Sequence, residues 1–133
     1  MSKTLSQLND LTGKNAVVIG GSGFLGAAGC EVLAELGANV TIASRTLKKC
    51  EEVMKLLAVN GDSQQHRVYS VDVTDNDSMH EFANKVDGID ILILTAWNGR
   101  KNSWESINLE DWKYDIDICL TSNFMAIKLL ENN

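Results

Sequence analysis

The sequence predicts an α/β protein in which a parallel sheet lies between two layers of helices, a three-layer α/β/α arrangement. Four short apolar runs of β type alternate along the chain with segments of 3.6-residue periodicity, and no low-complexity linker separates them. The length of 133 residues and the hydrophobic content of 44% suit one compact domain, which we expect to cover residues 1–133. The expected architecture is therefore a partial doubly wound parallel sheet.

The first unit joins a strand at residues 15–19 to a helix at residues 23–36. Gly37 follows the helix directly, and glycine is the residue that most often ends a helix. Because apolar residues on one side of a helix usually face the core, we expect an inner face formed by Leu25, Gly29, Val32 and Leu36.

The second and third units repeat this pattern. The second has a strand at residues 39–43 and a helix at residues 47–59, whose apolar stripe consists of Leu47, Cys50, Met54 and Leu57. The third has a strand at residues 67–71, followed by a helix that Thr74 would cap, with Asp77 three residues further on. The expected inner face of that helix consists of Met79, Phe82, Ala83 and Val86.

The fourth unit pairs a strand at residues 89–95 with a long helix at residues 109–131. The strand is almost wholly apolar, which is typical of a strand buried on both faces of a parallel sheet. The helix has two apolar sides, which predict two packing partners: the sheet, and either a second subunit or another part of the fold. One side carries Trp112, Ile116, Cys119, Leu120, Asn123 and Ile127, and the other carries Tyr114, Ile118, Met125 and Leu129.

Composition excludes several classes of partner. Twelve basic and eighteen acidic residues give a net charge of -6 without a basic cluster, so we expect no nucleic-acid partner. The chain has no apolar run of about 18 residues and no signal-peptide pattern, so we expect a cytoplasmic protein with no membrane contact. Its three cysteines are widely separated and His66 and His80 lack metal-ligand spacing, which favours reduced, buried thiols and no metal site.

A glycine-rich stretch, Gly20-Gly-Ser-Gly23-Phe-Leu-Gly26, follows the first strand and opens a helix. This is the context that a dinucleotide-binding loop requires. Gly20 would make the tight turn, Gly23 would let the backbone approach a pyrophosphate, and Gly26 would let the helix pack on the strand. The alternative is that the glycines serve only the turn. The cofactor contacts expected from this stretch are Gly20, Ser22, Gly23, Phe24, Leu25 and Gly26.

Ser44 and Arg45 end the second strand, about 20 residues beyond the loop, where an NAD-binding protein would place an acidic residue. No carboxylate is present there. A guanidinium can pair bidentately with the 2′-phosphate of NADP, and the Ser44 hydroxyl can add a donor. The sequence therefore favours NADP(H) over NAD(H), the alternative being that Arg45 is an ordinary solvated side chain.

With these features the chain resembles the short-chain dehydrogenase/reductase family over nearly its whole length. The resemblance is carried by Leu11-Thr-Gly-Lys14, the glycine loop, Asp72-Val73 and Glu110-Asp-Trp112. It implies a Rossmann-type sheet with four strands in the order 3-2-1-4. It also implies that Asp72 lies beside the adenine and that Val73 packs on, or hydrogen-bonds to, the same ring.

The sequence departs from the family pattern at several places, including Phe24, where the main branch of the family has the middle glycine of its loop. After the fourth strand the family has Asn-Asn-Ala-Gly, and the aligned residues here are Leu94-Thr-Ala-Trp97, so only Ala96 is retained as an expected cofactor contact. Cys119 falls where the family has a catalytic asparagine, and a thiol cannot reproduce the paired donor and acceptor of an amide. Asn123 lies one turn later on the same helix face, where a buried side chain bonded to the backbone is favoured over a substitute catalytic role.

The family exchanges a hydride between a nicotinamide and a carbonyl/alcohol pair with the help of a serine and a Tyr-x-x-x-Lys motif. The tyrosines here are Tyr69 and Tyr114, and the residues four positions later are Val73 and Ile118. We therefore expect no catalytic residue in this chain, which would be the truncated, cofactor-binding part of an NADP(H)-dependent oxidoreductase. The alternative is a non-catalytic dinucleotide-binding or interaction module that forms a homo-oligomer through the helix at residues 109–131, by the side that carries Tyr114, Ile118, Met125 and Leu129.

Overall fold

A computed structural model describes residues 8–97 and 103–133. Four parallel strands form one sheet: β1 (Asn15–Ile19), β2 (Asn39–Ser44), β3 (Arg67–Ser70) and β4 (Ile91–Leu94). Their order is β3-β2-β1-β4, which confirms the expected fold class and strand order. β1 lies at the centre, pairing Val18 with Ile42 of β2 and with Ile93 of β4. The carboxyl ends of all four strands therefore meet at one edge of the sheet.

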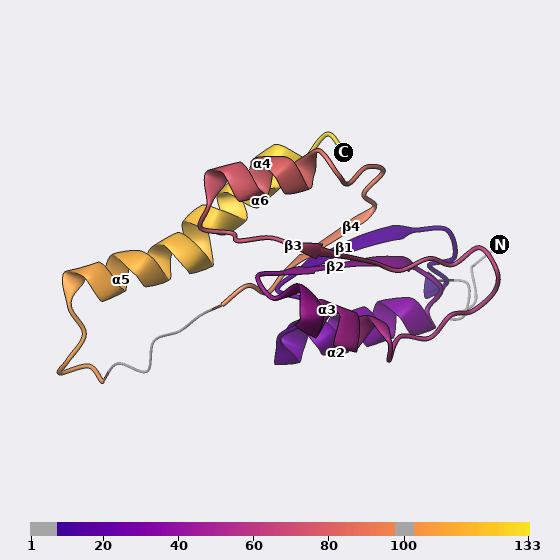
Figure 1. Ribbon diagram of the computed structural model, residues 1–133, viewed down its shortest axis with the longest axis horizontal. Coiled ribbons are helices and arrows are strands. Elements are labelled where there is room, and N and C mark those ends of the chain that lie inside the picture. Colours follow the sequence, from indigo (N-terminus) through magenta and orange to yellow (C-terminus); the bar gives the residue numbers. More distant parts are fainter. Residues whose placement is uncertain (1–7, 98–102) are drawn as a thin grey trace.

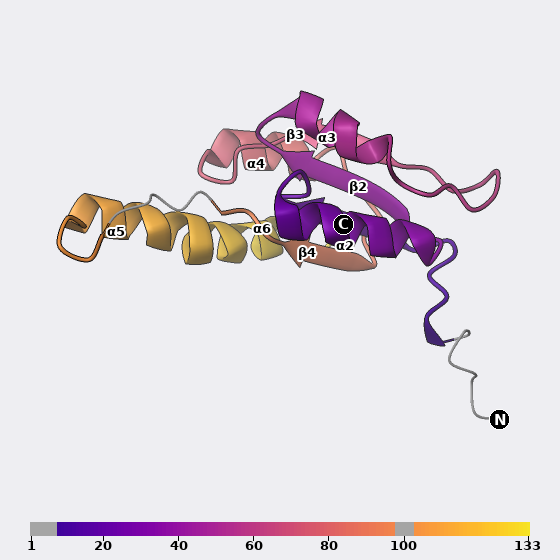
Figure 2. The same ribbon diagram turned by 90° about the horizontal axis from the view of Figure 1, so that it is seen from below.

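Helices cover both faces of the sheet (Figure 1). One face is covered by α2 (Phe24–Glu35) and α3 (Leu47–Met54), and the other by α4 (Asn76–Ala83) and α6 (Ser122–Leu130). The helix α5 (Leu109–Ile116) continues into α6 through a π-helical turn, η1 (Asp117–Thr121). Figure 2 shows that α5 extends away from the sheet, so that only the α6 half of this long helix lies over it.

The core under α2 and α3 uses a different side of α2 from the one predicted. Leu25 and Val32 are exposed, and the buried residues are Gly26, Cys30, Leu33 and Ala34. Small side chains at Gly26, Cys30 and Ala34 let α2 approach the sheet closely, so the larger apolar residues lie outside. Helical spacing cannot separate these two stripes, because both recur with the same period.

The core under α4 and α6 matches the expectation for α4, whose four predicted inner residues are all buried. The predicted cap was wrong by one residue. Asp75, not Thr74, caps α4, because its Oδ1 accepts hydrogen bonds from the backbone N–H groups of Asp77 at 2.9 Å and Ser78 at 3.2 Å. The Thr74 hydroxyl instead donates to Asp72 Oδ1 at 2.7 Å.

Several predicted boundaries were too generous. The helix expected at residues 47–59 ends at Met54, and Leu47 lies exposed at its start, whereas Cys50 and Leu57 are buried. The strand expected at residues 89–95 is limited to Ile91–Leu94, and all four of its residues are half-buried. The expectation that this strand is buried on both faces was therefore wrong. Within the described part of the chain it is an edge strand, with β1 as its one strand neighbour.

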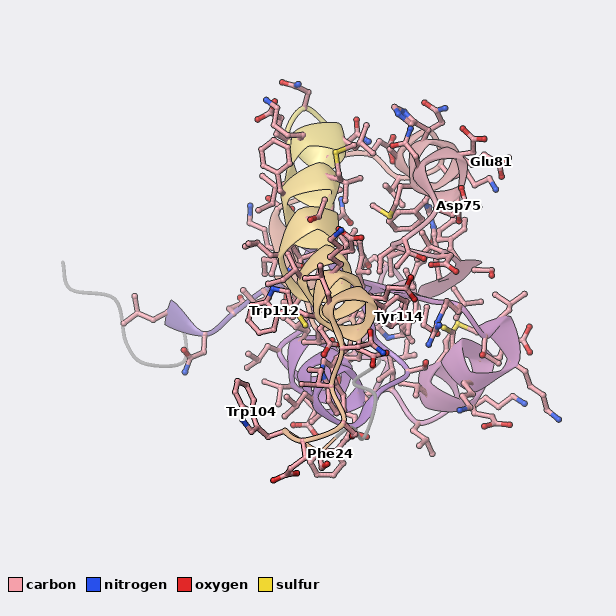
Figure 3. The ribbon with its side chains drawn as sticks, turned by 90° about the vertical axis from the view of Figure 1, so that its left-hand side faces the viewer. Phe24, Asp75, Glu81, Trp104, Trp112 and Tyr114 are labelled. Atoms are coloured by element: carbon pink, nitrogen blue, oxygen red, sulfur yellow. The ribbon has the colours of Figure 1, made fainter. Side chains whose placement is uncertain are left out.

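The two apolar sides of the long helix have the reverse of their expected roles. The Tyr114 side was expected to pair with another subunit. Ile118 is buried and Leu129 packs against the core, so that side faces the sheet. Figure 3 shows Trp112 and Tyr114 on opposite sides of α5. The other side forms an exposed apolar stripe, which consists of Trp112, Ile116, Leu120, Phe124 and Ile127.

The thiols and His66 fit the prediction only in part. Cys30 and Cys50 are buried and unpaired, but Cys119 is exposed, so the expectation of a buried thiol there was wrong. Burial raises the pKa of the Cys30 thiol to about 12, and the neighbouring Cys50 adds to the rise. His66 is hydrogen-bonded within the fold: its ring accepts from the Val40 N–H at 3.2 Å and lies 2.9 Å from the Ala58 carbonyl oxygen.

Candidate functional site

The turn after β1 depends on a glycine at position 20. Gly20 has a φ of 83°, a left-handed conformation that residues with a side chain rarely adopt. A Cβ atom at this position would lie 2.5 Å from the backbone nitrogen of Ala96, which follows β4. The N–H groups of Gly20 and Gly21 donate to the Ala43 carbonyl at 2.8 and 3.2 Å. The turn is therefore held between the ends of β2 and β4.

The other two glycines of the loop have different surroundings. A Cβ atom on Gly26 would collide with the backbone of Gly20 and Gly21, which explains how α2 can start directly against the turn. Gly23 is exposed, and a Cβ atom there would meet only the Gly20 carbonyl oxygen, at 3.2 Å. Gly23 therefore leaves open the space in front of the loop, which is the cradle that a phosphate group needs.

The start of α2 lacks the usual side-chain cap. Within the described part of the chain, no side chain accepts a hydrogen bond at its N-cap, Gly23, and its first turn carries no acidic residue. Backbone N–H groups at a helix start, together with the helix dipole, attract anions. The local structure is thus suited to a phosphate group and would be poorly suited to a cation.

A groove with a volume of about 200 Å³ runs along the carboxyl ends of the four strands. It brings together most of the cofactor contacts predicted from the sequence, namely Gly20, Ser22, Gly23, Ser44, Arg45, Asp72, Val73 and Ala96. Three predicted contacts do not line it. Gly26 is buried beneath the loop, Leu25 is exposed, and the side chain of Phe24, the first residue of α2, is 93% exposed (Figure 3).

Some lining residues were not predicted as contacts: Thr46, Lys49, Thr74, Thr95, Trp97 and Ile118. Thr46 and Lys49 closely follow Arg45, so their position after a strand end was an available signal. Ile118 comes from the distant η1 turn and lies in the groove because that helix crosses the end of the sheet. Nothing in its local sequence marks it.

The end of β2 is joined to the glycine loop through side chains. Ser22 Oγ and Ser44 Oγ are 2.7 Å apart, and Ser44 Oγ lies 3.1 Å from Cys50 Sγ on α3. The carbonyl of Arg45 accepts a hydrogen bond from the Ser70 hydroxyl at 3.2 Å, which fixes the backbone at the end of β2. The Arg45 side chain is exposed beside the groove.

Asp72 lies at the end of β3, across the groove from Arg45. Its Oδ1 accepts hydrogen bonds from the backbone N–H of Thr74 at 2.9 Å and from the Thr74 hydroxyl. Partial burial raises the pKa of this carboxyl, but the Thr74 hydrogen bonds and the charge of Arg45 lower it more, so its pKa is below the usual 3.8. Asp72 is therefore an ionised acceptor at neutral pH.

The end of β4 carries the residues that depart from the family pattern. The Thr95 hydroxyl donates to the Ile19 carbonyl at 3.1 Å and so holds β4 against β1. Trp97 lines the groove but is 72% exposed, so its indole leaves the groove open rather than filling it. The residues at 98–102, which complete this connection, lie outside the described part of the chain.

The position of the family's catalytic asparagine falls on the η1 turn. Cys119 is exposed there, and its carbonyl accepts a hydrogen bond from Asn123 Nδ2 at 2.9 Å. The expectation that Asn123 bonds to the backbone is confirmed, but the expectation that it is buried was wrong, because the residue is only half-buried. Tyr69 packs edge-on against Phe82, with ring centroids 5.7 Å apart, so it contributes to the core.

Comparison with known proteins places this arrangement in a family. The family described as short chain dehydrogenase matches residues 14–132. An uncharacterized oxidoreductase of Mycobacterium tuberculosis is 36% identical over 104 residues, which cover 74% of this chain and 30% of that protein. The chain belongs to the short-chain dehydrogenase family.

Solved structures agree with this assignment. A short-chain type dehydrogenase/reductase from Mycobacterium marinum has a TM-score of 0.84 at 25% identity, covering 96% of this chain and 53% of that one. The RhlG/NADP complex of Pseudomonas aeruginosa has a TM-score of 0.81 at 25% identity, covering 92% of this chain and 48% of that one. The chain thus spans about half the length of these structural relatives. Within residues 8–97 and 103–133, no helix has both the length and the apolar character needed to cross a membrane.

Proposed function

We propose that the chain binds NADP(H) in the groove and is the cofactor-binding part of an NADP(H)-dependent short-chain oxidoreductase. The observation that carries the proposal is that the uncapped start of α2 and Arg45 lie along one groove. Gly23, which has no side chain, leaves room for a ligand at the start of the helix. A dinucleotide carries its phosphates at two such places, a pyrophosphate in the middle and, in NADP, a phosphate on the ribose.

Each part of the groove has a distinct task in this proposal. The N–H groups at the start of α2 bind the pyrophosphate, because they and the helix dipole are oriented toward it. Arg45 binds the 2′-phosphate, and Lys49, which also lines the groove, adds positive charge at the same end. Asp72 and Val73 bind the adenine, which is attached to the same ribose as the 2′-phosphate. Ala96 and Trp97 border the end of the groove beyond β4.

A bound nicotinamide supplies hydride-transfer chemistry, but the residues of this chain supply no proton exchange to accompany it. Neither Tyr69 nor Tyr114 has a lysine four residues later, and Tyr69 is packed against Phe82. We therefore expect the 133-residue chain to bind the cofactor without reducing a carbonyl compound. NADPH oxidation at an ordinary enzymatic rate with a ketone or aldehyde would contradict this expectation.

Calorimetric titration of the chain with NADPH and with NADH tests the cofactor preference. We expect NADPH to bind at least about tenfold more tightly, since a charge-assisted bidentate pair forms only with the 2′-phosphate. Arg45→Glu should remove most of this difference. Arg67→Glu is a matched control, because it makes the same charge change at the start of β3, away from the groove. Equal affinities of the unaltered chain for the two cofactors would remove Arg45 from this role.

A second candidate function, a non-catalytic module that dimerises, is favoured by the exposed apolar stripe on α5, η1 and α6. The stripe includes Leu120, which is 64% exposed, and Trp112 and Phe124, which are more than half exposed. A discrete dimer in light scattering, lost in Leu120→Glu but kept in the neighbouring exposed variant Thr121→Glu, would support this function. A strict monomer at high concentration would contradict it.

A further inference from the structure

A chain of three side chains joins the glycine loop to the buried part of α3. Ser22 Oγ lies 2.7 Å from Ser44 Oγ, which lies 3.1 Å from Cys50 Sγ. The two serines are half-buried and line the groove, whereas Cys50 is 0% exposed and belongs to the core. The groove is thus connected to a thiol that no ligand can touch.

The chemistry of the three groups favours one donor-to-acceptor direction for the two hydrogen bonds that join them. Each hydroxyl donates one proton and accepts up to two, while a thiol is a weak donor and a weak acceptor. If Cys50 donates to Ser44 and Ser44 donates to Ser22, both serine oxygens accept a hydrogen bond. The Ser22 proton then remains available to a ligand in the groove. In the opposite arrangement Ser22 donates to Ser44 and Ser44 donates to Cys50. The Ser44 proton then meets a weak sulfur acceptor, and the Ser22 proton is directed away from the groove.

The available proton lies at one end of the groove. Ser44 immediately precedes Arg45, and Arg45 and Ser22 line the same groove. A hydroxyl donor beside a guanidinium suits a phosphate monoester, whose oxygens accept from both. In NADP the group of that kind is the 2′-phosphate.

We propose that Cys50 is a positioning residue for the choice of cofactor: its thiol directs the Ser22 proton, through Ser44, toward the 2′-phosphate of NADP(H). This inference rests on the proposed function, because it assigns a role within the same groove. Cys50 touches no ligand itself. Its effect should therefore appear in the ratio of the NADPH and NADH affinities, which a general loosening of the fold would leave unchanged.

The test measures both affinities by calorimetry in the full chain and in four variants. Ser22→Ala should weaken NADPH binding about tenfold and NADH binding little, because one hydrogen bond to a charged group is lost. Cys50→Ala should weaken NADPH binding about threefold, and Cys50→Ser, which restores a donor, should recover it. Cys30→Ala removes an equally buried thiol, which donates weakly to the Gly21 carbonyl at 3.9 Å and not to Ser22 or Ser44, so the affinity ratio should not change.

The double variant Ser22→Ala/Cys50→Ala completes the test. If Cys50 acts only through Ser22, the double variant should bind NADPH no more weakly than Ser22→Ala does. An additive loss, an unchanged affinity ratio in Cys50→Ala, or failure of Cys50→Ser to recover it would overturn the positioning role while leaving the proposed function intact. Absence of binding of either cofactor to the unaltered chain would overturn both.

Discussion

The first βαβ unit, residues 15–44, and the region from β4 to α6, residues 91–130, differ in how their apolar residues are used. In β1 the four residues from Ala16 to Ile19 are at most 2% exposed. In β4, which is just as apolar, all four residues are half-buried. Similar composition therefore produces a complete core in one region and an incompletely covered surface in the other.

The difference follows from position in the sheet. β1 has a strand on each side and helices on both faces, so every side chain has neighbours. β4 has one strand neighbour, and the helices near it present apolar residues to solvent, among them Val32 on α2 and Leu120 on the long helix. The comparison teaches that the region carrying the glycine loop has a fully covered core, whereas the β4 side has the composition of an interior but is only partly covered.

The largest effect is expected at the turn of the first unit. Gly20→Ala should lower the free energy of unfolding by about 3 kcal/mol, because it combines a left-handed φ with a collision against Ala96. Gly29→Ala is the matched control, because its new Cβ atom would lie 3.9 Å from Ile93, an ordinary contact. This variant should raise the free energy of unfolding by about 0.5 kcal/mol. Urea denaturation measures both, and similar values for the two variants would show that the turn does not depend on Gly20.

A second pair of variants compares the two regions directly. Val18 and Ile93 are register partners in β1 and β4, and Val18 is 0% exposed. Val18→Ala should lower the free energy of unfolding by about 2.5 kcal/mol, and Ile93→Ala by only about 1 kcal/mol although it removes more carbon. The same denaturation measurement applies. A larger loss for Ile93→Ala would mean that β4 is covered in solution, and the contrast between the two strands would fail.

A smaller effect is expected at the start of α4. Asp75→Ala should lower the free energy of unfolding by about 1 kcal/mol, since two backbone N–H groups lose their acceptor. Asp75→Asn keeps an oxygen acceptor and should retain most of the stability. If Thr74→Ala were more damaging than Asp75→Ala, the cap would be at residue 74 after all.

The smallest effect concerns acid stability. The pKa of Asp72 in the folded protein is below the ordinary value of 3.8, so the ionised carboxyl stabilises the fold above that value and the stabilisation is lost as the pH falls through the lowered pKa. Stability of the unaltered chain should therefore fall more steeply below pH 4 than that of Asp72→Asn. Parallel pH profiles in chemical denaturation would contradict this assignment.

Periodicity was sufficient to predict the four strands, and glycine spacing was sufficient to predict the loop, whereas the strand order followed from the family resemblance. The glycine loop is local in sequence, and Ser44 and Arg45 end the next strand, so both could be assigned from the residues themselves. Asp72 and Ala96 were assigned through the family resemblance, and they lie near the loop because parallel strands bring their carboxyl ends together. These predictions depend on the backbone geometry of a strand–helix–strand unit, which is the same wherever such a unit forms.

The inner faces of α2 and of the long helix could not be predicted in the same way. Each helix has two apolar stripes, and the stripe that is buried depends on how closely the helix approaches the sheet. In α2 the small residues Cys30 and Ala34 allow that approach, while in the long helix the side with Ile118 lies over the groove. Groove residues from distant elements, such as Ile118, are missed for the same reason.

The central position of β1 has a consequence for the order of folding. Its contact with β2 joins Asn15 to Asn39, 24 residues apart, whereas its contact near β4 joins Asn15 to Asp90, 75 residues apart. The longer closure costs about 1 kcal/mol more in chain entropy, so we expect β4 to dock after the first unit has formed. During synthesis at roughly 5–20 residues per second, one edge of β1 would remain unpaired for several seconds. Until β4 emerges, that edge is available to any other extended chain.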